Sequence, residues 1–186
     1  MLIIHGNSAL SDFRKNSLKT KIMQAVNKVT DISAVYVHLI KSVTELNDKQ
    51  LTTMKSLLEY GPADSAGHGE GGRLILVVPR VGTISPWSTK ATDIAHNCGL
   101  ECVERVERGI AYKVAFNGSD SEWDSVVNEL AAMLHDRMTE SVLFNIEDAA
   151  SLFEQQSPAP LEKIDLISGG IKALQQANSD LGLALS

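Results

Sequence analysis

Residues 73–99, RLILVVPRVGTISPWSTKATDIAHNCG, decide the fold of this 186-residue chain. The apolar run LILVV at 74–78 predicts a buried strand. A polar loop follows it, and Ser85 then stands where a helix N-cap belongs, with Pro86 at the first helical position. Gly99 supplies a stop signal, so a helix is expected over 85–99. The stretch therefore predicts a strand, a polar loop and a capped helix.

The pattern continues downstream. We expect strands over 102–108 and 110–116 that turn at Gly109, a helix over 120–137 and a strand over 140–144. Together with the opening stretch, this gives the order β-α-β-β-α-β.

A similar order precedes it. The expected elements are a strand, a helix, a strand and a helix, over residues 2–6, 8–29, 32–43 and 44–60. Ser8 is expected to cap the first helix, and Asn47 or Asp48 is expected to open the second.

The repeated order predicts an α+β fold. It consists of two ferredoxin-like halves with mainly antiparallel sheets, which face one another or join edge to edge, and helices packed on one face. The halves are residues 1–60 and 73–145, and the Gly-rich stretch 61–72 connects them as a flexible linker. Residues 146–186 are expected to be a linker followed by a C-terminal helical segment. The last helical pattern, 171–186, stops in the apolar phrase GLALS, so we expect the chain to have been cut from something longer.

Composition excludes several classes of function. The net charge of −6, without a cluster of Lys or Arg, argues against nucleic-acid binding. The apolar runs fall far below the roughly 18 residues of a membrane-spanning helix, so no membrane partner is expected. The two cysteines, Cys98 and Cys102, fit a reducing cytoplasm. Their C-x3-C spacing and His96 do not match a zinc site, and we expect the cysteines to be buried small hydrophobic residues with no metal bound.

Four stretches carry a resemblance to a known family. They are PRVGTISPWSTKATDIAHNCGL at 79–100, VERVERGIAYKV at 103–114, LHDRMTESV at 134–142 and IKALQQANSDLGLALS at 171–186. The chain resembles, over essentially its whole length, the N-terminal region of the large, single-chain phosphoribosylformylglycinamidine synthase. In that family this region is similar to a dimer of a separate small subunit, which agrees with the two predicted halves.

The resemblance implies a role in de novo purine biosynthesis. The family is an ATP-consuming amidoligase that uses glutamine to convert formylglycinamide ribonucleotide to the amidine. The resemblance places ATP, magnesium and the glutaminase in other domains, so this fragment is expected to be cytoplasmic, non-catalytic and without a cofactor. Its implied partners are the catalytic synthetase and glutaminase domains of the same full-length chain.

The loop and helix after the central strand hold the candidate site residues. These candidates for an interface or for substrate proximity are Arg80, Ser85, Trp87, Ser88, Thr89, Lys90 and Asp93. A docking surface with an exposed Trp87 is the favoured interpretation, because an aromatic ring beside polar groups is typical of an interface anchor. Two alternatives stay open: anion binding by Asp93 with Lys90, Arg80 and the helix N-terminus, and Trp87 as an ordinary core residue.

Other polar residues receive structural interpretations. His38 alternates with apolar residues in a strand, which ordinary packing explains. Glu104, Arg105, Glu107 and Arg108 alternate on the 102–108 strand, and we expect them to form cross-strand charge pairs.

The predicted fold is also compatible with a second class of function. A ferredoxin-like pair could act alone as a small-molecule-sensing module, since related folds serve many functions.

Overall fold

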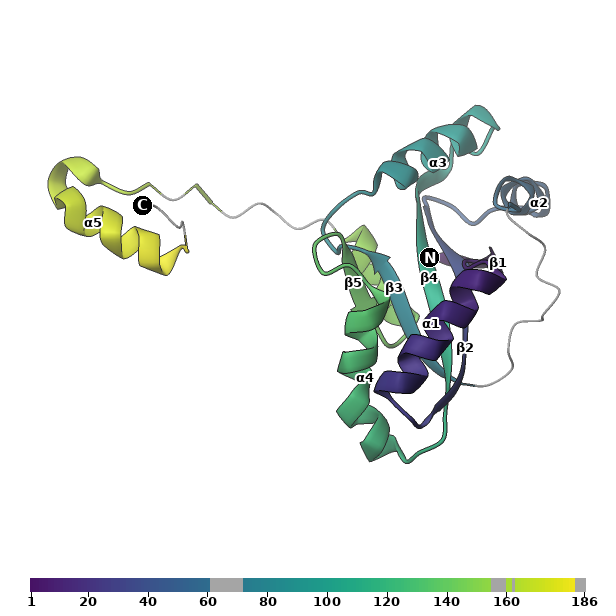
Figure 1. Cartoon of the computed structure of the whole chain (residues 1–186). Helices are drawn as coiled ribbons and strands as arrows, with labels where there is room; N and C mark the ends of the chain where they lie inside the picture. Colours follow the sequence, from purple (N-terminus) through teal and green to yellow (C-terminus); the bar gives the residue numbers. More distant parts are fainter. Residues whose placement is uncertain (61–71, 155–159, 162, 183–186) are drawn as a thin grey trace. The chain divides into compact units, whose positions relative to one another are not determined.

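The computed structural model describes residues 1–60, 72–154, 160–161 and 163–182 (Figure 1). The chain divides into two compact units, Met1–Gln155 and Gln156–Ser186.

The first unit is an α+β domain around one five-stranded sheet. Its elements, in chain order, are β1 (Leu2–Ser8), α1 (Asp12–Ala25), β2 (Val29–Ser42), α2 (Asp48–Leu57), β3 (Arg73–Pro79), α3 (Pro86–Asn97), β4 (Val103–Phe116), α4 (Asp120–Leu134), β5 (Glu140–Leu143) and the 3-10 helix η1 (Glu147–Phe153). The strand order is β1-β2-β4-β3-β5, and every neighbouring pair is antiparallel. The α+β class and the antiparallel sheet are thus confirmed.

The two halves join edge to edge through their long strands. Residues 1–60 supply β1 and β2, and residues 73–145 supply β3, β4 and β5. The ladder between β2 and β4 runs from Val29 opposite Phe116 to Ser42 opposite Val103. Both halves therefore share one continuous sheet.

The expected turn at Gly109 is wrong. Strand β4 runs through Gly109 without interruption, and this residue pairs with Val37 of β2. A Cβ atom at position 109 would lie 2.8 Å from the carbonyl oxygen of Val77 on the other neighbouring strand. Glycine here permits a close approach of two backbones inside a sheet, which is a common role of glycine in the interior of a strand. The second half is consequently β-α-β-α-β.

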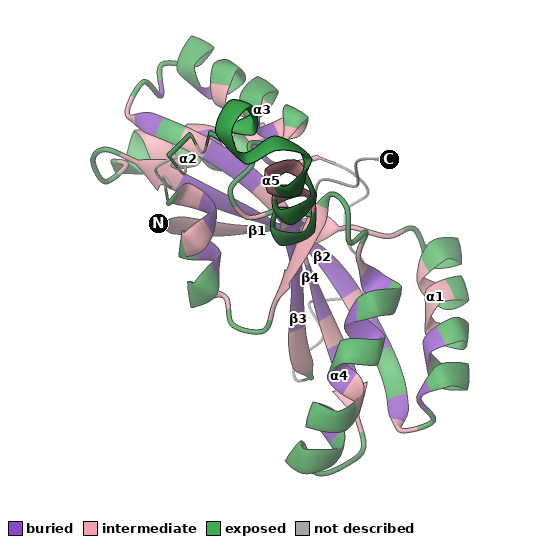
Figure 2. Ribbon diagram, turned by 90° about the vertical axis from the view of Figure 1, so that its left-hand side faces the viewer, coloured by how far each residue is buried: buried purple, intermediate pink, exposed green. Residues whose placement is uncertain are grey.

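Helices α1 to α4 cover one face of the sheet, as predicted, in two pairs (Figures 1 and 2). Alternate residues of a strand point to one face, so Ile32, Ala34 and Ile40 of β2 all point to the helix side. The first two pack with α1 and α4, and Ile40 packs with α2 and α3. Helix η1 covers the opposite face over Val37 and Leu39.

This arrangement has an approximate twofold symmetry. Exchanging the halves exchanges β1 with β3, β2 with β4, and the α1–α4 core with the α3–α2 core. Tyr36 lies opposite Ile110 at the middle of the β2–β4 ladder, between the two cores. The duplication that element order suggested is therefore also present in the packing.

Local signals set the helix ends. The Ser85 hydroxyl accepts the N–H of Ser88 at the start of α3, and Gly99 ends the helix with a φ of 80°. Asn47 forms a capping box with Gln50 at the start of α2. Helix α1 is capped by Ser11 and not by the expected Ser8, which is the last residue of β1.

The second unit contains α5 (Leu166–Asp180). Asp165 caps it by accepting the N–H groups of Ile167 and Ser168, and Gly170 interrupts it with a φ of 57°. The helical segment predicted over 171–186 is present but starts earlier, and residues 183–186 lie outside the described residues. The predicted connector 61–72 lies outside them as well, apart from Gly72.

Candidate functional site

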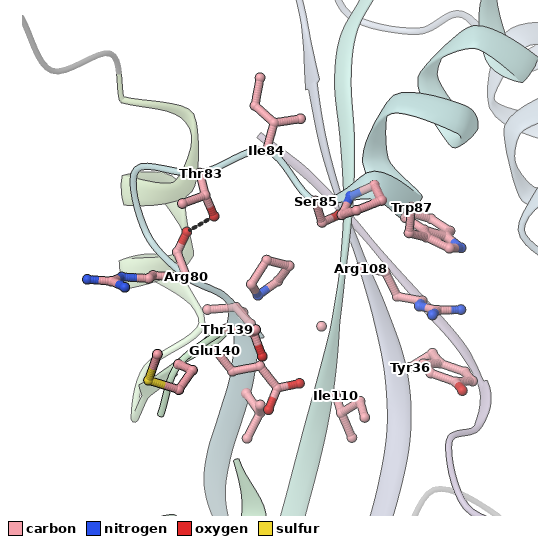
Figure 3. Close-up of a pocket in the computed structure, with 16 residues that line it drawn as sticks. Tyr36, Arg80, Thr83, Ile84, Ser85, Trp87, Arg108, Ile110, Thr139 and Glu140 are labelled. Carbon is pink, nitrogen blue, oxygen red and sulfur yellow. Dashed lines mark hydrogen bonds between the residues drawn. The ribbon is translucent and has the colours of Figure 1, made fainter. Parts of the chain in front are cut away.

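A cavity of about 530 Å³ lies at the middle of the helix-bearing face (Figure 3). Its floor is formed by the C-terminal end of β3 and the centre of β4, and its walls by the loop before α3 and by the residues around the start of β5. The residues that line it include Tyr36, Arg80, Ile84, Trp87, Arg108 and Met138. The cavity exists because the two helix pairs pack over the ends of the sheet and leave its centre uncovered.

Arg108 of β4 lies between two aromatic rings. Its guanidinium carbon is 4.7 Å from the ring centroid of Tyr36 and 4.8 Å from that of Trp87. Tyr60 is a third aromatic neighbour at 5.9 Å. Cation–π contacts of this kind favour a charged, ordered guanidinium. Arg108 is therefore held in one orientation by side chains from both halves.

His38 of β2 is the residue directly opposite Arg108 in the ladder, and it is fully buried. Its Nδ1 lies 3.3 Å from the carbonyl oxygen of Ile4, and its Nε2 lies 2.6 Å from the Tyr60 hydroxyl. A carbonyl can only accept, so Nδ1 carries the proton and Nε2 accepts from Tyr60. The Tyr60 oxygen in turn accepts from Arg108 Nη1 at 3.4 Å. Burial, with a smaller contribution from the Arg108 charge, lowers the pKa of His38 to about 4. The imidazole is thus neutral near pH 7.

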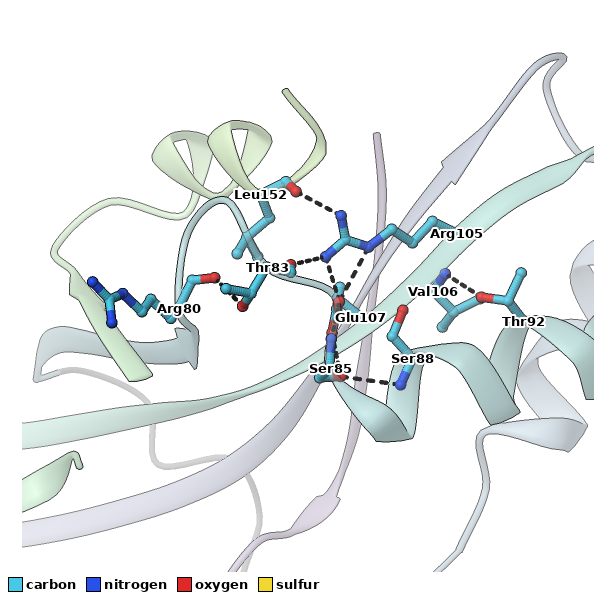
Figure 4. Close-up of polar contacts among 9 residues, drawn as sticks. All are labelled: Arg80, Thr83, Ser85, Ser88, Thr92, Arg105, Val106, Glu107 and Leu152. Atoms are coloured by element: carbon cyan, nitrogen blue, oxygen red, sulfur yellow. Dashed lines mark hydrogen bonds and ion pairs between the residues drawn. The ribbon is translucent and has the colours of Figure 1, made fainter. Parts of the chain in front are cut away.

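A buried ion pair fixes the loop that forms one wall (Figure 4). Glu107 is fully buried and accepts hydrogen bonds from Arg105 and from both the backbone N–H and the hydroxyl of Ser85. Arg105 also donates to the carbonyl oxygens of Thr83, at 2.6 Å, and Leu152, at 2.9 Å. This network ties the loop before α3, the helix cap and η1 to β4.

The expected cross-strand charge pairs are therefore only partly correct. Glu104 does pair across strands, with Lys41 of β2 at 2.8 Å. Arg105 and Glu107, however, pair along the same strand, and Arg108 stacks on aromatic rings.

The predicted site residues separate into two groups. Arg80, Thr89, Lys90 and Asp93 are exposed, and the Arg80 side chain points away from the cavity (Figure 3). Ser85 is partly buried, where it caps α3 and binds Glu107.

Two of the predicted site residues need correction. Trp87 was expected to be exposed, but it is half-buried, because its ring packs on Arg108 and on His38, whose ring centroid is 5.8 Å away. Ser88 is only 1% exposed and faces inward from the first turn of α3, so it is not available to a partner surface.

The cysteines also differ from the expectation of burial. Cys98 is exposed because it follows the last turn of α3, and Cys102 is half-buried. Within the described parts of the chain, no three His, Cys, Asp or Glu residues gather in a way that could hold a metal ion. His96 instead lies with its Nε2 2.6 Å from the carbonyl oxygen of Val103.

Sequence reasoning missed the importance of Tyr36, His38, Tyr60 and Arg108. The available signal was the alternation of side chains along a strand, which places Tyr36 and His38 on one face of β2. Arg108 points to the same face, but this follows only once the β2–β4 register is known. That register joins residues about 70 positions apart in the sequence, which local patterns do not determine.

The fold and the site define a class, namely a small α+β domain made of two fused, similar halves around a central cavity lined by both polar and apolar side chains. The family model described as formylglycinamide ribonucleotide amidotransferase N-terminal matches residues 35–153, more than half of the chain. The chain belongs to this family, the N-terminal domain of an enzyme of purine biosynthesis. The match confirms the resemblance stated from the sequence. Among the described residues, no helix has both the length and the apolar character needed to cross a bilayer.

Proposed function

We propose that this chain is the non-catalytic N-terminal domain of a glutamine-dependent, ATP-consuming amidoligase. The full reaction would convert formylglycinamide ribonucleotide to formylglycinamidine ribonucleotide in the cytoplasm, with ATP and magnesium bound by other domains. The chain's own role would be to dock onto the catalytic synthetase and glutaminase domains of the same full-length protein. The family match over residues 35–153 carries this proposal.

The chemistry of the described residues supports a docking role. They do not form a carboxylate cluster of the kind that holds magnesium. What they offer is an ordered cavity lined by both apolar and charged side chains. Ile84 is 64% exposed and Met138 is 76% exposed, and both line the cavity. Apolar groups within a polar rim are typical of an interface.

Residues 80–93, in the loop before α3 and on its first turns, would present this surface to a partner domain. The Arg105–Glu107 pair fixes the loop before α3, so Ile84 projects from an ordered support. Lys90 and Thr89 are exposed on the first turns of α3 beside it. A docking surface that is already ordered loses little conformational freedom on association.

The test is made in the full-length enzyme. Ile84→Asp and Lys90→Ala should lower the kcat/KM of amidine formation by about tenfold or more, the cost of losing an interface residue. The matched control is Lys49→Ala, an exposed lysine on α2 away from the cavity. All three variants should leave the thermal midpoint of the 186-residue chain unchanged, because the replaced side chains are exposed.

Full activity in both Ile84→Asp and Lys90→Ala would remove this surface from the proposal. Glutamine hydrolysis or ATP turnover by the purified 186-residue chain would contradict its non-catalytic role.

A further inference from the structure

Arginines stacked on aromatic rings recur within the described residues, and most of them have a carboxylate partner. Arg73 lies over the rings of Phe116 and Trp123 and forms an ion pair with Asp120. Arg105 lies over the ring of Phe153 and forms an ion pair with Glu107. Arg108 has the most aromatic neighbours, yet it takes part in none of the ion pairs that the described residues form.

The stack leaves one part of the Arg108 guanidinium available. Tyr36 and Trp87 cover its two faces, so only its edge, with the N–H groups, can bind further atoms. The indole nitrogen of Trp87, the guanidinium of Arg108 and the hydroxyl of Tyr36 all lie at the same side of the stack (Figure 3). The only hydrogen bond that the Arg108 side chain makes to the described residues is the 3.4 Å contact to the Tyr60 hydroxyl.

These groups are mainly hydrogen-bond donors. An indole N–H and a guanidinium can only donate, and a phenol can donate as well. The edge of a guanidinium matches two oxygens of one carboxylate or phosphate group, and a partly buried cation gains most from such a partner. Because the stack already orders Arg108, a ligand would not have to fix that side chain.

We propose that Trp87, Arg108 and Tyr36 form a binding site for an oxyanion, the carboxylate or phosphate group of a small-molecule ligand. This site goes beyond the docking role proposed above and does not depend on it. The anion takes the place beside Arg108 that Asp120 and Glu107 take beside the other two stacked arginines.

Nuclear magnetic resonance of the 186-residue chain tests the site directly. The chain has two tryptophans, so its spectrum has two indole N–H signals, one from Trp87 and one from Trp123. Inorganic phosphate and acetate are titrated separately, with chloride keeping the ionic strength constant. The Trp87 signal should shift and saturate, while the Trp123 signal, beside the already paired Arg73, should stay in place. The anion with the higher affinity distinguishes a phosphate-bearing ligand from a carboxylate-bearing one.

Variants assign the effect to Arg108. Arg108→Lys keeps the charge but loses the paired N–H groups, and we expect it to weaken the binding of the preferred anion by about tenfold. Arg73→Lys is the matched control, an equally stacked arginine, and should leave the Trp87 titration unchanged. An unshifted Trp123 signal in Arg108→Lys shows that the variant is folded.

Three results would overturn the proposal. The first is a shift of both indole signals in parallel, without saturation. The second is an unchanged affinity in Arg108→Lys. The third concerns Asp64 and Glu70, which lie outside the described residues: if anions bind only after Asp64→Asn and Glu70→Gln are introduced, the chain itself supplies the carboxylate.

Discussion

Protonation of His38 should destabilise the first unit between pH 6.5 and pH 4. The imidazole is fully buried, and burial is the main reason that its pKa falls from 6.5 to about 4. Arg108 lowers this pKa further, whereas the contact with the Ile4 carbonyl opposes the shift. Once protonated, Nε2 could no longer accept from Tyr60. The polar groups named here beside the ring are thus the Arg108 cation, the Tyr60 hydroxyl and the Ile4 carbonyl, and none of these three carries a negative charge that would pair with a protonated imidazole.

The sign and the size follow from linkage. The pKa is lower in the folded state, so the unfolded chain binds the proton more tightly. The stabilisation from a neutral His38 is complete above pH 6.5 and is lost as the pH falls towards the folded-state value of about 4. At about 1.4 kcal/mol for each pH unit, the full loss is about 3 kcal/mol. Between pH 7 and pH 5 it is about 2 kcal/mol.

Urea unfolding at pH 7, 6 and 5 measures this loss. Other groups also titrate, so the chain is compared with His38→Gln, which cannot bind the proton. The variant should be less stable at pH 7, because it loses the ordered contacts with Ile4 and Tyr60. Its stability should nevertheless fall less steeply, and the two curves should converge by about 2 kcal/mol between pH 7 and pH 5.

Parallel curves, within about 0.5 kcal/mol over this range, would refute the reasoning. So would a ring-proton titration of His38 near its ordinary value of 6.5 in the folded chain. Either result would mean that water reaches the imidazole, or that the ring leaves its position between Ile4 and Tyr60.

The backbone contact and the buried ion pair give two more predictions, both measured by chemical denaturation. Gly109→Ala should cost about 3 kcal/mol, because its Cβ would lie 2.8 Å from a backbone oxygen of Val77 that cannot move aside. Gly82→Ala, with no atom within 4 Å but a φ of 85°, should cost only about 1 kcal/mol, and equal losses would contradict the steric argument. Glu107→Gln should cost about 3 kcal/mol or more, because Arg105 would keep a partly buried charge without its carboxylate. Adding Arg105→Met should recover part of this loss, and costs that simply add would show that the pair is not coupled.

Features set by local chemistry were predicted well from the sequence. Ser85, Pro86 and Gly99 specify the ends of α3 through the cap hydrogen bond, the fixed φ of proline and a left-handed φ. Each of these effects acts within a few residues, so the local sequence contains what is needed. The order of strands and helices follows in the same way, apart from the division of β4 at Gly109.

Gly109 shows where local reasoning stops. Glycine permits both a turn and a close approach between strands, and the residue itself does not distinguish them. The choice depends on Val37 and Val77, which flank it in the sheet and lie far away in the sequence.

The site was harder to predict for the same reason. Arg80 and Lys90 are recognisable because both lie in one short stretch of the chain, the loop before α3 and the first turns of that helix. The stack around Arg108 is assembled from β2, α3 and β4, and it exists only through their packing. A polar residue alternating with apolar ones, such as His38, has the same sequence pattern whether it is isolated or part of such a cluster.

The ladder between β2 and β4 also bears on how the two halves find each other. Its partners, from Val29 with Phe116 to Ser42 with Val103, all lie outside the stretch that links the halves. Two separate chains with these surfaces would associate to a degree that depends on their concentration. Covalent linkage makes the encounter intramolecular, so it no longer depends on the concentration of the chain. Dilution therefore does not separate the two halves. Because the halves are no longer identical, the linkage also ensures that each first half pairs with a second half.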